Sequence, residues 1–313
     1  NVLSDSVYNV RVCFGIYRTD NMNESLSFMC DKASFAVASI KDDTHSFIAY
    51  YDDTMLEAAI KYKTIVDEFD DAIKAGEFKM YLQPQISAKT RRLTGAEALV
   101  RRIKPDGTII SPIDFIPVYE KSGLISRLDR YIWEQAAAKL GEWKKAGINM
   151  SISVNISPKD FYYIDIFNTF AGLIKKYDIE PSNLKIEITE TTIMSDVPNL
   201  MGELEELRKA GFTLEMDDFG SGYSSLNTLK DINVDVLKVD MGFIKETKNV
   251  KKSRIILASV IKMAKELNLL IITEGVETEE QVDNLTKLGC DVFQGYYFSK
   301  AIDVNEFEKR YLY

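Results

Sequence analysis

The chain carries at residues 215–226 the run Glu215-Met216-Asp217-Asp218-Phe219-Gly220-Ser221-Gly222-Tyr223-Ser224-Ser225-Leu226. The preceding residues 211–214 are β-branched, aromatic and aliphatic after a glycine, which predicts a short buried strand. Neighbouring strand residues face opposite ways, so Asp217 and Asp218 serve one site only if the chain turns there, which the glycines permit. Adjacent acids before glycine are also ordinary turn or capping chemistry. The rest of the chain must decide between a turn and a site.

Strand-like and helix-like segments alternate beyond Gly76. The predicted strands cover residues 78–83, 93–100, 150–155, 184–188, 212–216, 236–239, 270–273 and 291–293. Amphipathic helices are predicted between them, for example over 125–146, 159–177, 199–210, 253–267 and 279–288. A doubly wound open sheet is the alternative, but no GxGxxG follows the first strand. We therefore predict an α/β fold, a (β/α)8 TIM-like barrel of parallel strands, over residues 77–313.

The residues before the barrel predict two smaller parts. Residues 1–53 read as strand, helix and strand over 10–17, 24–40 and 46–52, a small α+β fragment with no chemical constellation. Residues 54–76 predict a linker helix that ends at Gly76, as helix-ending glycines do.

The composition narrows the class of protein. The chain has 313 residues, a net charge of −9 and three cysteines without a CxxC pair, so we expect neither disulfides nor zinc and a reduced, cytoplasmic setting. His45, the single histidine, lies in a polar stretch and is expected in a solvated loop, which argues against a Ser-His-Asp triad. Any metal would therefore be bound by oxygen ligands, which favours magnesium or manganese. We see no membrane-spanning run and expect no long nucleic acid as partner.

Polar side chains stand at the C-terminal ends of seven consecutive predicted strands. They include Glu97, Arg101, Asn155, Glu187, Glu190, Asp217, Asp218, Lys238, Asp240, Glu274, Glu277 and Gln294. Each alone has an ordinary explanation as a helix cap, an ion pair or a backbone partner. Together on one face of a barrel they would be costly to bury unless cations neutralise them. This distribution predicts a divalent-metal site.

The same residues carry a family resemblance. The chain resembles the EAL family of cyclic di-GMP phosphodiesterases in a series of short motifs. They are Glu97-Ala98-Leu99 with Arg101, the Asn155 segment, the run 187–190, the run 217–225, the run 237–240, the run 274–278 and Gln294-Gly295-Tyr296. The match covers the whole predicted barrel. It implies hydrolysis of cyclic di-GMP to linear pGpG with two magnesium or manganese ions, by a homodimer formed through this domain.

The resemblance also implies roles for single residues. The implied metal ligands are Glu97, Asn155, Glu187, Asp217, Asp218 and Glu274. Lys238 matches a lysine that orients or activates the attacking water, and we expect metals to lower its pKa. The other implied active-site groups are Asp218, Glu274, Glu277 and Gln294, with Gln83, Arg101 and Asp240 as substrate contacts. Glu190 matches the anchor of the Asp217-Asp218 loop, which in the family also belongs to the dimer contact.

Residues 1–53 resemble, more weakly, the C-terminal end of a GGDEF domain. Gly15, Asp31-Lys32-Ala33 and Asp52 carry this likeness, while the Gly-Gly-(Asp/Glu)-Glu-Phe signature is absent from the sequence. The chain is therefore expected to be a piece of a longer GGDEF–EAL protein, whose other parts could attach to a membrane, and is not expected to make cyclic di-GMP.

Two rival functions remain open. One is a cyclic di-GMP receptor that binds without turnover and signals through its dimer; the other is an unrelated metal-dependent barrel enzyme for another phosphate ester. The presence of every implied ligand together with Lys238 and Glu190 argues against the receptor.

Overall fold

The computed structural model describes residues 12–19, 23–41, 46–195, 197, 199–220, 229–230, 232–240 and 250–313. The predicted loop residue His45, the beginning of the predicted strand 10–17 and residues 221–226 lie outside these ranges. The chain divides into two compact units, Asn1–Asp71 and Ala72–Tyr313. None of the described helices is both long and apolar enough to span a membrane.

The described residues of the first unit form a two-stranded sheet with the helices α1 and α2. Strands β1 (Phe14–Ile16) and β2 (Ile48–Tyr50) pair in parallel, and α1 (Leu26–Ser39) connects them. The Asp52 side chain caps α2 (Asp53–Asp67) by accepting a hydrogen bond from the Thr54 N–H. The single helix expected over 54–76 is divided, because α2 ends at Asp67 and α3 (Phe69–Lys74) follows after Glu68.

The second unit is a closed barrel of eight strands, as predicted. Its strands, in chain order, are β3 (Phe78–Ser87), β4 (Leu93–Ile103), β6 (Ile152–Ile156), β7 (Leu184–Thr189), β8 (Leu214–Asp217), β9 (Val236–Asp240), β10 (Leu270–Glu274) and β11 (Val292–Phe293). Each pairs with the next, and β11 pairs back to β3, which closes the barrel. Two short strands, β5 (Ile109–Ile110) and β12 (Ile302–Asp303), add to β4 and β3.

One strand runs against the expected direction. β3 is antiparallel to both of its barrel neighbours, β4 and β11. The reason is the short connection over residues 88–92, in which Arg91 has a φ of 58° and donates its N–H to the Ser87 carbonyl at 2.9 Å. Such a hairpin leaves no room for the crossover that parallel strands need. The expectation of a parallel first strand was therefore wrong.

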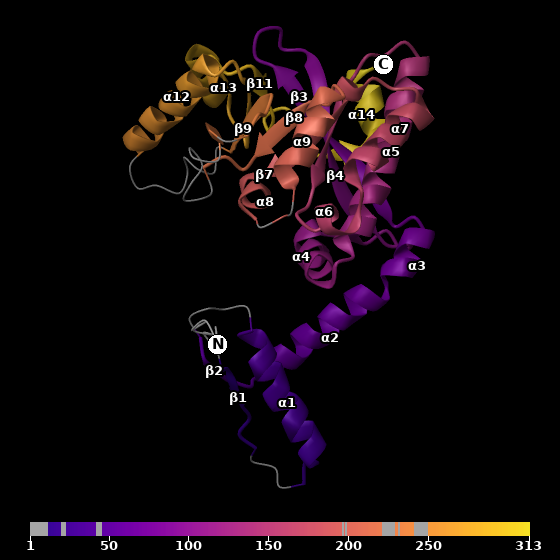
Figure 1. Cartoon of the computed structure of the whole chain (residues 1–313), viewed down its shortest axis with the longest axis vertical. Coiled ribbons are helices and arrows are strands. Elements are labelled where there is room, and N and C mark those ends of the chain that lie inside the picture. The colour runs from indigo at the N-terminus through magenta and orange to yellow at the C-terminus, as the bar shows by residue number, and fades with distance from the viewer. Residues whose placement is uncertain are drawn as a thin grey trace, which may run out of the picture. The chain divides into compact units, whose positions relative to one another are not determined.

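Helices cover the outside of the barrel (Figure 1). They are α4 (Pro112–Ser122), α5 (Ile125–Lys145), α6 (Asp160–Tyr163), α7 (Ile166–Tyr177), α8 (Glu190–Met194), α9 (Leu200–Lys209), α12 (Val250–Glu266), α13 (Glu279–Leu288) and α14 (Val304–Tyr311). The helix predicted over 159–177 is two helices, since Asp165 accepts a hydrogen bond from the Asn168 N–H and begins α7 anew.

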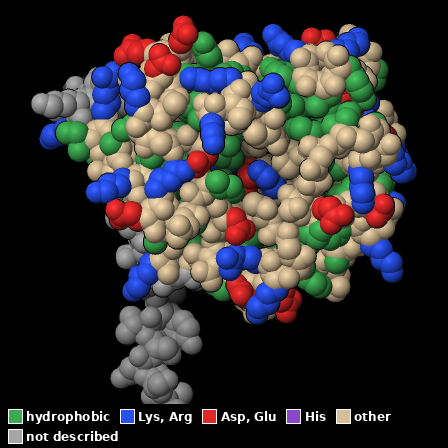
Figure 2. All heavy atoms as spheres, turned by 90° about the horizontal axis from the view of Figure 1, so that it is seen from above, with side chains coloured by type: hydrophobic (Ala, Val, Ile, Leu, Met, Phe, Trp, Pro, Cys, Tyr) green, Lys and Arg blue, Asp and Glu red, His purple; other side chains and the backbone are tan. Residues whose placement is uncertain are grey.

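The core lies between the helices and the outward face of the strands. Trp133 and Trp143 of α5 are almost fully buried, as are Ile152 and Val154 of β6. Because strand residues alternate between two faces, this apolar packing leaves the other face of each strand to line the barrel interior. On the outer surface shown in Figure 2, basic and acidic side chains are interspersed.

Candidate functional site

The barrel interior holds a lysine surrounded by four carboxylates. Lys238 of β9 is fully buried, and its Nζ lies 2.7 Å from Glu274 Oε1 and 2.9 Å from Glu187 Oε2. The same Nζ lies 3.4 Å from Glu97 Oε2 and 3.4 Å from Asp217 Oδ1. Five different strands therefore bring their polar side chains to one point. All five residues were predicted members of the site.

The charges in this cluster do not balance. Burial alone would lower the pKa of Lys238, but the charges of Glu187 and Glu274 raise it well above its ordinary value. The carboxylates by themselves thus raise the lysine pKa, and the expected lowering by metal ions stays a prediction. Burial raises the pKa of Glu187, with Glu97 as the next cause, and burial raises that of Glu274 to about 8. One ammonium is too little charge for four carboxylates, of which Glu97 and Glu187 are buried and Asp217 and Glu274 are partly buried.

Amide side chains hold the Glu97 carboxylate from two sides. Asn155 Nδ2 donates to Glu97 Oε1 at 3.4 Å, and Gln294 Nε2 donates to Glu97 Oε2. Gln294 Nε2 also donates to Gln83 Oε1 at 3.3 Å. Gln83 stands opposite Glu97 in the antiparallel β3–β4 register, so the reversed strand still delivers its side chain to the site.

A cavity of about 320 Å³ opens beside the cluster. Most of its lining residues come from the ends of β9 and β10 and from the segment that follows β11. They are Gln83, Asp240, Glu274, Gly275, Glu277, Gln294, Gly295 and Tyr296. The structure therefore brings five predicted site residues to one cavity.

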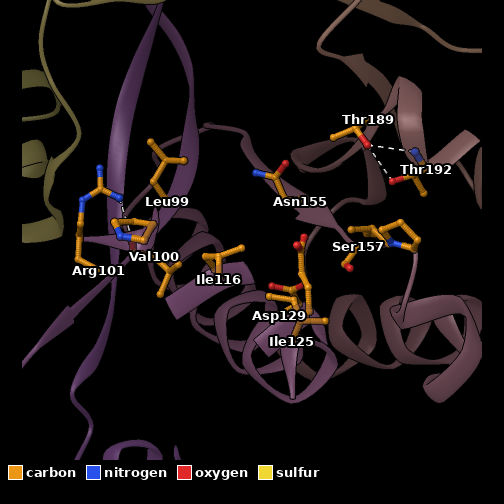
Figure 3. A pocket seen from close by; sticks show the side chains of 14 residues that line it. Leu99, Val100, Arg101, Ile116, Ile125, Asp129, Asn155, Ser157, Thr189 and Thr192 are labelled. Atoms are coloured by element: carbon orange, nitrogen blue, oxygen red, sulfur yellow. Dashed lines mark hydrogen bonds between the residues drawn. The ribbon is translucent and has the colours of Figure 1, made fainter. Parts of the chain in front are cut away.

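A second cavity, of about 280 Å³, lies at Asn155 and Arg101 (Figure 3). Leu99, Ile116 and Ile125 give it apolar walls. The carboxyls of Asp129 and Glu120 also line it, and burial raises the pKa of each. In Asp129 the neighbouring Asp160 is the next cause.

Sequence reasoning missed this carboxyl pair. Asp129 lies four residues after the buried Ile125 and four before the buried Trp133, so it interrupts an apolar helix face. A carboxylate at such a position is a signal that could have found it, because charged side chains rarely lie on the buried face of a helix.

The turn predicted at the two aspartates is present. Asp218 has a φ of 55°, and its N–H donates to Asp217 Oδ1 at 2.8 Å. Asp218 is itself exposed, and partial desolvation followed by the charge of Asp217 raises its pKa. The buried Glu190 accepts a hydrogen bond from the Gly220 N–H at 3.3 Å. The carboxylate of Glu190 thus contacts the loop that follows β8.

The donor set at Lys238 suits a hard cation. In the described part of the chain, no three acidic, histidine or cysteine side chains are arranged to enclose an ion, and Lys238 Nζ lies among the carboxylates. Yet Glu187 Oε1 is buried without a hydrogen-bond partner among the described residues, and Glu187 Oε2 has the Lys238 ammonium beside it. Oxygen atoms with excess negative charge are the ligands that magnesium and manganese take. The residues present therefore fit such ions.

Comparisons with known proteins match the barrel. A family model described as the EAL domain matches residues 66–301. The chain is 34% identical over 278 residues to the signaling protein YkoW of Bacillus subtilis (strain 168), covering 89% of this chain and 35% of that protein. It is 37% identical over 238 residues to the probable cyclic di-GMP phosphodiesterase PdeG of Escherichia coli (strain K12), covering 74% and 46% respectively. The chain thus spans between a third and a half of these curated relatives.

A solved structure shows the same likeness in three dimensions. The PaMucR phosphodiesterase in complex with c-di-GMP aligns with a TM-score of 0.73 and 32% sequence identity, covering 78% of this chain and 99% of that one.

Proposed function

The chain belongs to the EAL domain family, and on that premise we propose that it hydrolyses one phosphodiester bond of cyclic di-GMP to give linear pGpG. The observation that carries the proposal is the Lys238 cluster, which holds four carboxylates at one point beside two cavities. Similarity to a probable cyclic di-GMP phosphodiesterase and to a phosphodiesterase solved with c-di-GMP supports the choice of substrate.

Two magnesium or manganese ions are part of this proposal. The residues that would hold them are Glu97, Asn155, Glu187, Asp217, Asp218 and Glu274, all of which offer oxygen atoms. When bound, such ions would lower the pKa of a water molecule and stabilise developing negative charge. Asn155 and Gln294 fix the Glu97 carboxylate, and the Asp218 N–H fixes Asp217.

Lys238 acts in this scheme as a hydrogen-bond donor. The carboxylates around its Nζ favour the ammonium form, which orients the attacking water or a phosphate oxygen. Gln294 and Glu277 support the site from the wall of the larger cavity.

The two cavities provide places for the dinucleotide. Arg101 is a planar donor suited to a phosphate, while Gln83 and Asp240 line the larger cavity. The apolar walls of the smaller cavity suit a purine ring, and the acceptor oxygens of Asp129 and Glu120 suit the N–H groups of guanine.

Three finer expectations belong to the same proposal. Glu190 anchors the Asp217-Asp218 loop through Gly220, and the domain forms a homodimer, which sedimentation analysis would detect. The setting is cytoplasmic, in keeping with three free cysteines. Residues 1–53 derive from the end of a GGDEF domain, supported by the parallel β1–α1–β2 unit.

Chromatography of cyclic di-GMP after incubation with the chain tests the function. We expect pGpG to appear with magnesium or manganese and not with EDTA, and a Glu97→Gln control to give none. Intact nucleotide together with tight binding in calorimetry would replace hydrolysis by a receptor function. Turnover that cyclic di-GMP does not compete for would point to another phosphate ester.

A further inference from the structure

A second ion pair lies inside the barrel next to the cluster. Glu215 of β8 is fully buried, and Lys185 of β7 reaches it with a distance of 2.9 Å from Nζ to Glu215 Oε1. No role was predicted for either residue. Glu215 and Asp217 lie two positions apart on one strand, as do Lys185 and Glu187 on the next, so all four face the barrel interior.

The strand register places this pair directly beside a proposed metal ligand. Glu187 and Glu215 are partners in the parallel β7–β8 ladder, so adjacent strands present their carboxyls side by side. Lys185 precedes Glu187 by two residues and therefore lies on the side of the ladder away from the exposed rim. The pair thus forms a second charge layer beneath the Lys238 cluster.

Stability alone is a weak explanation for such a pair. Removing two charges from water costs free energy that their attraction often fails to recover, and apolar replacements of buried ion pairs are frequently neutral or stabilising. The pair can instead act on the neighbouring site, which is short of positive charge. Any net charge on Lys185 and Glu215 acts on Glu187 through a medium of low dielectric constant.

We propose that Glu215 is a positioning residue that acts through Glu187, and that Lys185 balances its charge, so that the pair sets the cation affinity of the site. This inference rests on the proposed metal-dependent function. With both residues present the layer is neutral. Loss of Glu215 leaves the cation of Lys185 beneath the site and opposes metal binding, whereas loss of Lys185 leaves an additional carboxylate and favours it.

The test measures the affinity of the metal-stripped full chain for Mn²⁺ alone by calorimetry at pH 8. Glu215→Gln, which keeps the side-chain shape, should weaken binding by about 10- to 100-fold, the range found for supporting residues of metal sites. Lys185→Met should bind at least as tightly as the wild-type chain. The double variant should recover most of the loss.

A matched control comes from another partly buried pair, Arg102–Glu77, whose Nε–Oε2 distance is also 2.9 Å. Glu77→Gln makes the same chemical change and leaves a partner cation, but neither residue lies in the Lys238 cluster or lines the two cavities. It should lower the thermal midpoint without changing Mn²⁺ affinity. A merely structural Lys185–Glu215 pair would behave in the same way.

The outcomes separate this inference from the function on which it rests. A wild-type chain that does not bind Mn²⁺ overturns both, whereas wild-type affinity retained in Glu215→Gln overturns the inference alone. Weaker binding in both single variants also overturns it, because opposite signs are required. Should Glu215→Gln fail to fold, the double variant must still bind more weakly than Lys185→Met, and equal affinities there would refute the inference.

Discussion

Two buried lysines, one in each unit, differ in the number of carboxylates around them. Lys32 in the first unit is 8% exposed, and its Nζ lies 3.0 Å from the Glu24 carboxylate and 2.9 Å from the Tyr17 hydroxyl. The rings of Tyr17 and Phe28 lie 4.4 Å and 4.5 Å from the same nitrogen. Lys238 in the barrel has four carboxylates and no aromatic ring within the described contacts.

The difference shows how a structural lysine is told from a site lysine. Lys32 has one carboxylate for one ammonium, and cation–π contacts complete its surroundings. Lys238 has four carboxyl groups around one ammonium, and burial makes it costly to ionise them all, which raises the pKa of Glu187 and of Glu274. Burial of a lysine alone therefore does not show whether it belongs to a cation-binding site. An excess of carboxylates over positive charges around it indicates such a site.

Removing one carboxylate beside each lysine should give the largest difference in turnover. Glu97→Ala removes a proposed metal ligand and leaves the amides of Asn155 and Gln294 without their acceptor, so turnover of cyclic di-GMP should fall below detection. Glu24→Ala should leave turnover unchanged. Chromatographic assay in magnesium measures both, and near-normal activity of Glu97→Ala would contradict the two-metal assignment.

Replacement of the lysines themselves sharpens the same contrast. Lys238→Met removes the donor that orients the water or phosphate, and we expect a loss of about 10²- to 10⁴-fold in kcat. Lys32→Met changes a group outside the barrel unit and should not alter kcat. Circular dichroism must show that both variants are folded. Equal kcat values of the two variants would show that Lys238 takes no part in the reaction.

Much of this site was predictable because its signals are local. Apolar runs located the barrel strands, and polar residues such as Asn155 and Glu187 at their ends located the rim. Strand direction was not predictable from periodicity, which is the same for parallel and antiparallel pairs; only the short link over 88–92 carries that information.

Other features depend on contacts between distant segments. Glu215 stood in the stretch first singled out, yet its partner Lys185 is brought to it only by the β7–β8 register. The raised pKa of Lys238 likewise depends on four strands converging, which no single motif shows. Sequence reasoning predicted the groups that converge on Lys238 and the excess of carboxylates among them, and it missed the partners that distant segments bring to them.

The loop after β8 offers a smaller effect. Glu190→Ala removes the acceptor for the Gly220 N–H, so the Asp217-Asp218 turn should loosen while the barrel stays folded. We expect Mn²⁺ affinity to fall by about tenfold, at the lower end for supporting residues. Glu24→Ala serves again as the control for carboxylate loss elsewhere. Unchanged metal dependence of Glu190→Ala would show that the anchor role is wrong.

The smallest expected effect is on thermal stability as a function of pH. Burial raises the pKa of Glu274 to about 8 in the folded chain, above the ordinary value of 4.5, so the folded state holds this proton more tightly than the unfolded state. The stability that this provides is full below pH 4.5 and is lost as the pH rises through about 8. In EDTA the melting temperature should therefore be lower at pH 9 than at pH 6.

The shift should amount to about 2–4 °C for each kcal/mol lost, as for domains of this size. Glu274→Gln should flatten the profile, and Mn²⁺ should raise the melting temperature at pH 9 because it binds only the folded chain. The Lys32–Glu24 pair should contribute no change between pH 6 and 9, since hydrogen bonds from Tyr17 and Lys32 lower the pKa of Glu24. If the melting temperature of Glu274→Gln still fell between pH 6 and pH 9 as in the wild-type chain, the proton would belong to another carboxyl group. The excess of carboxylates at Lys238 would then not be the cause of the pH dependence.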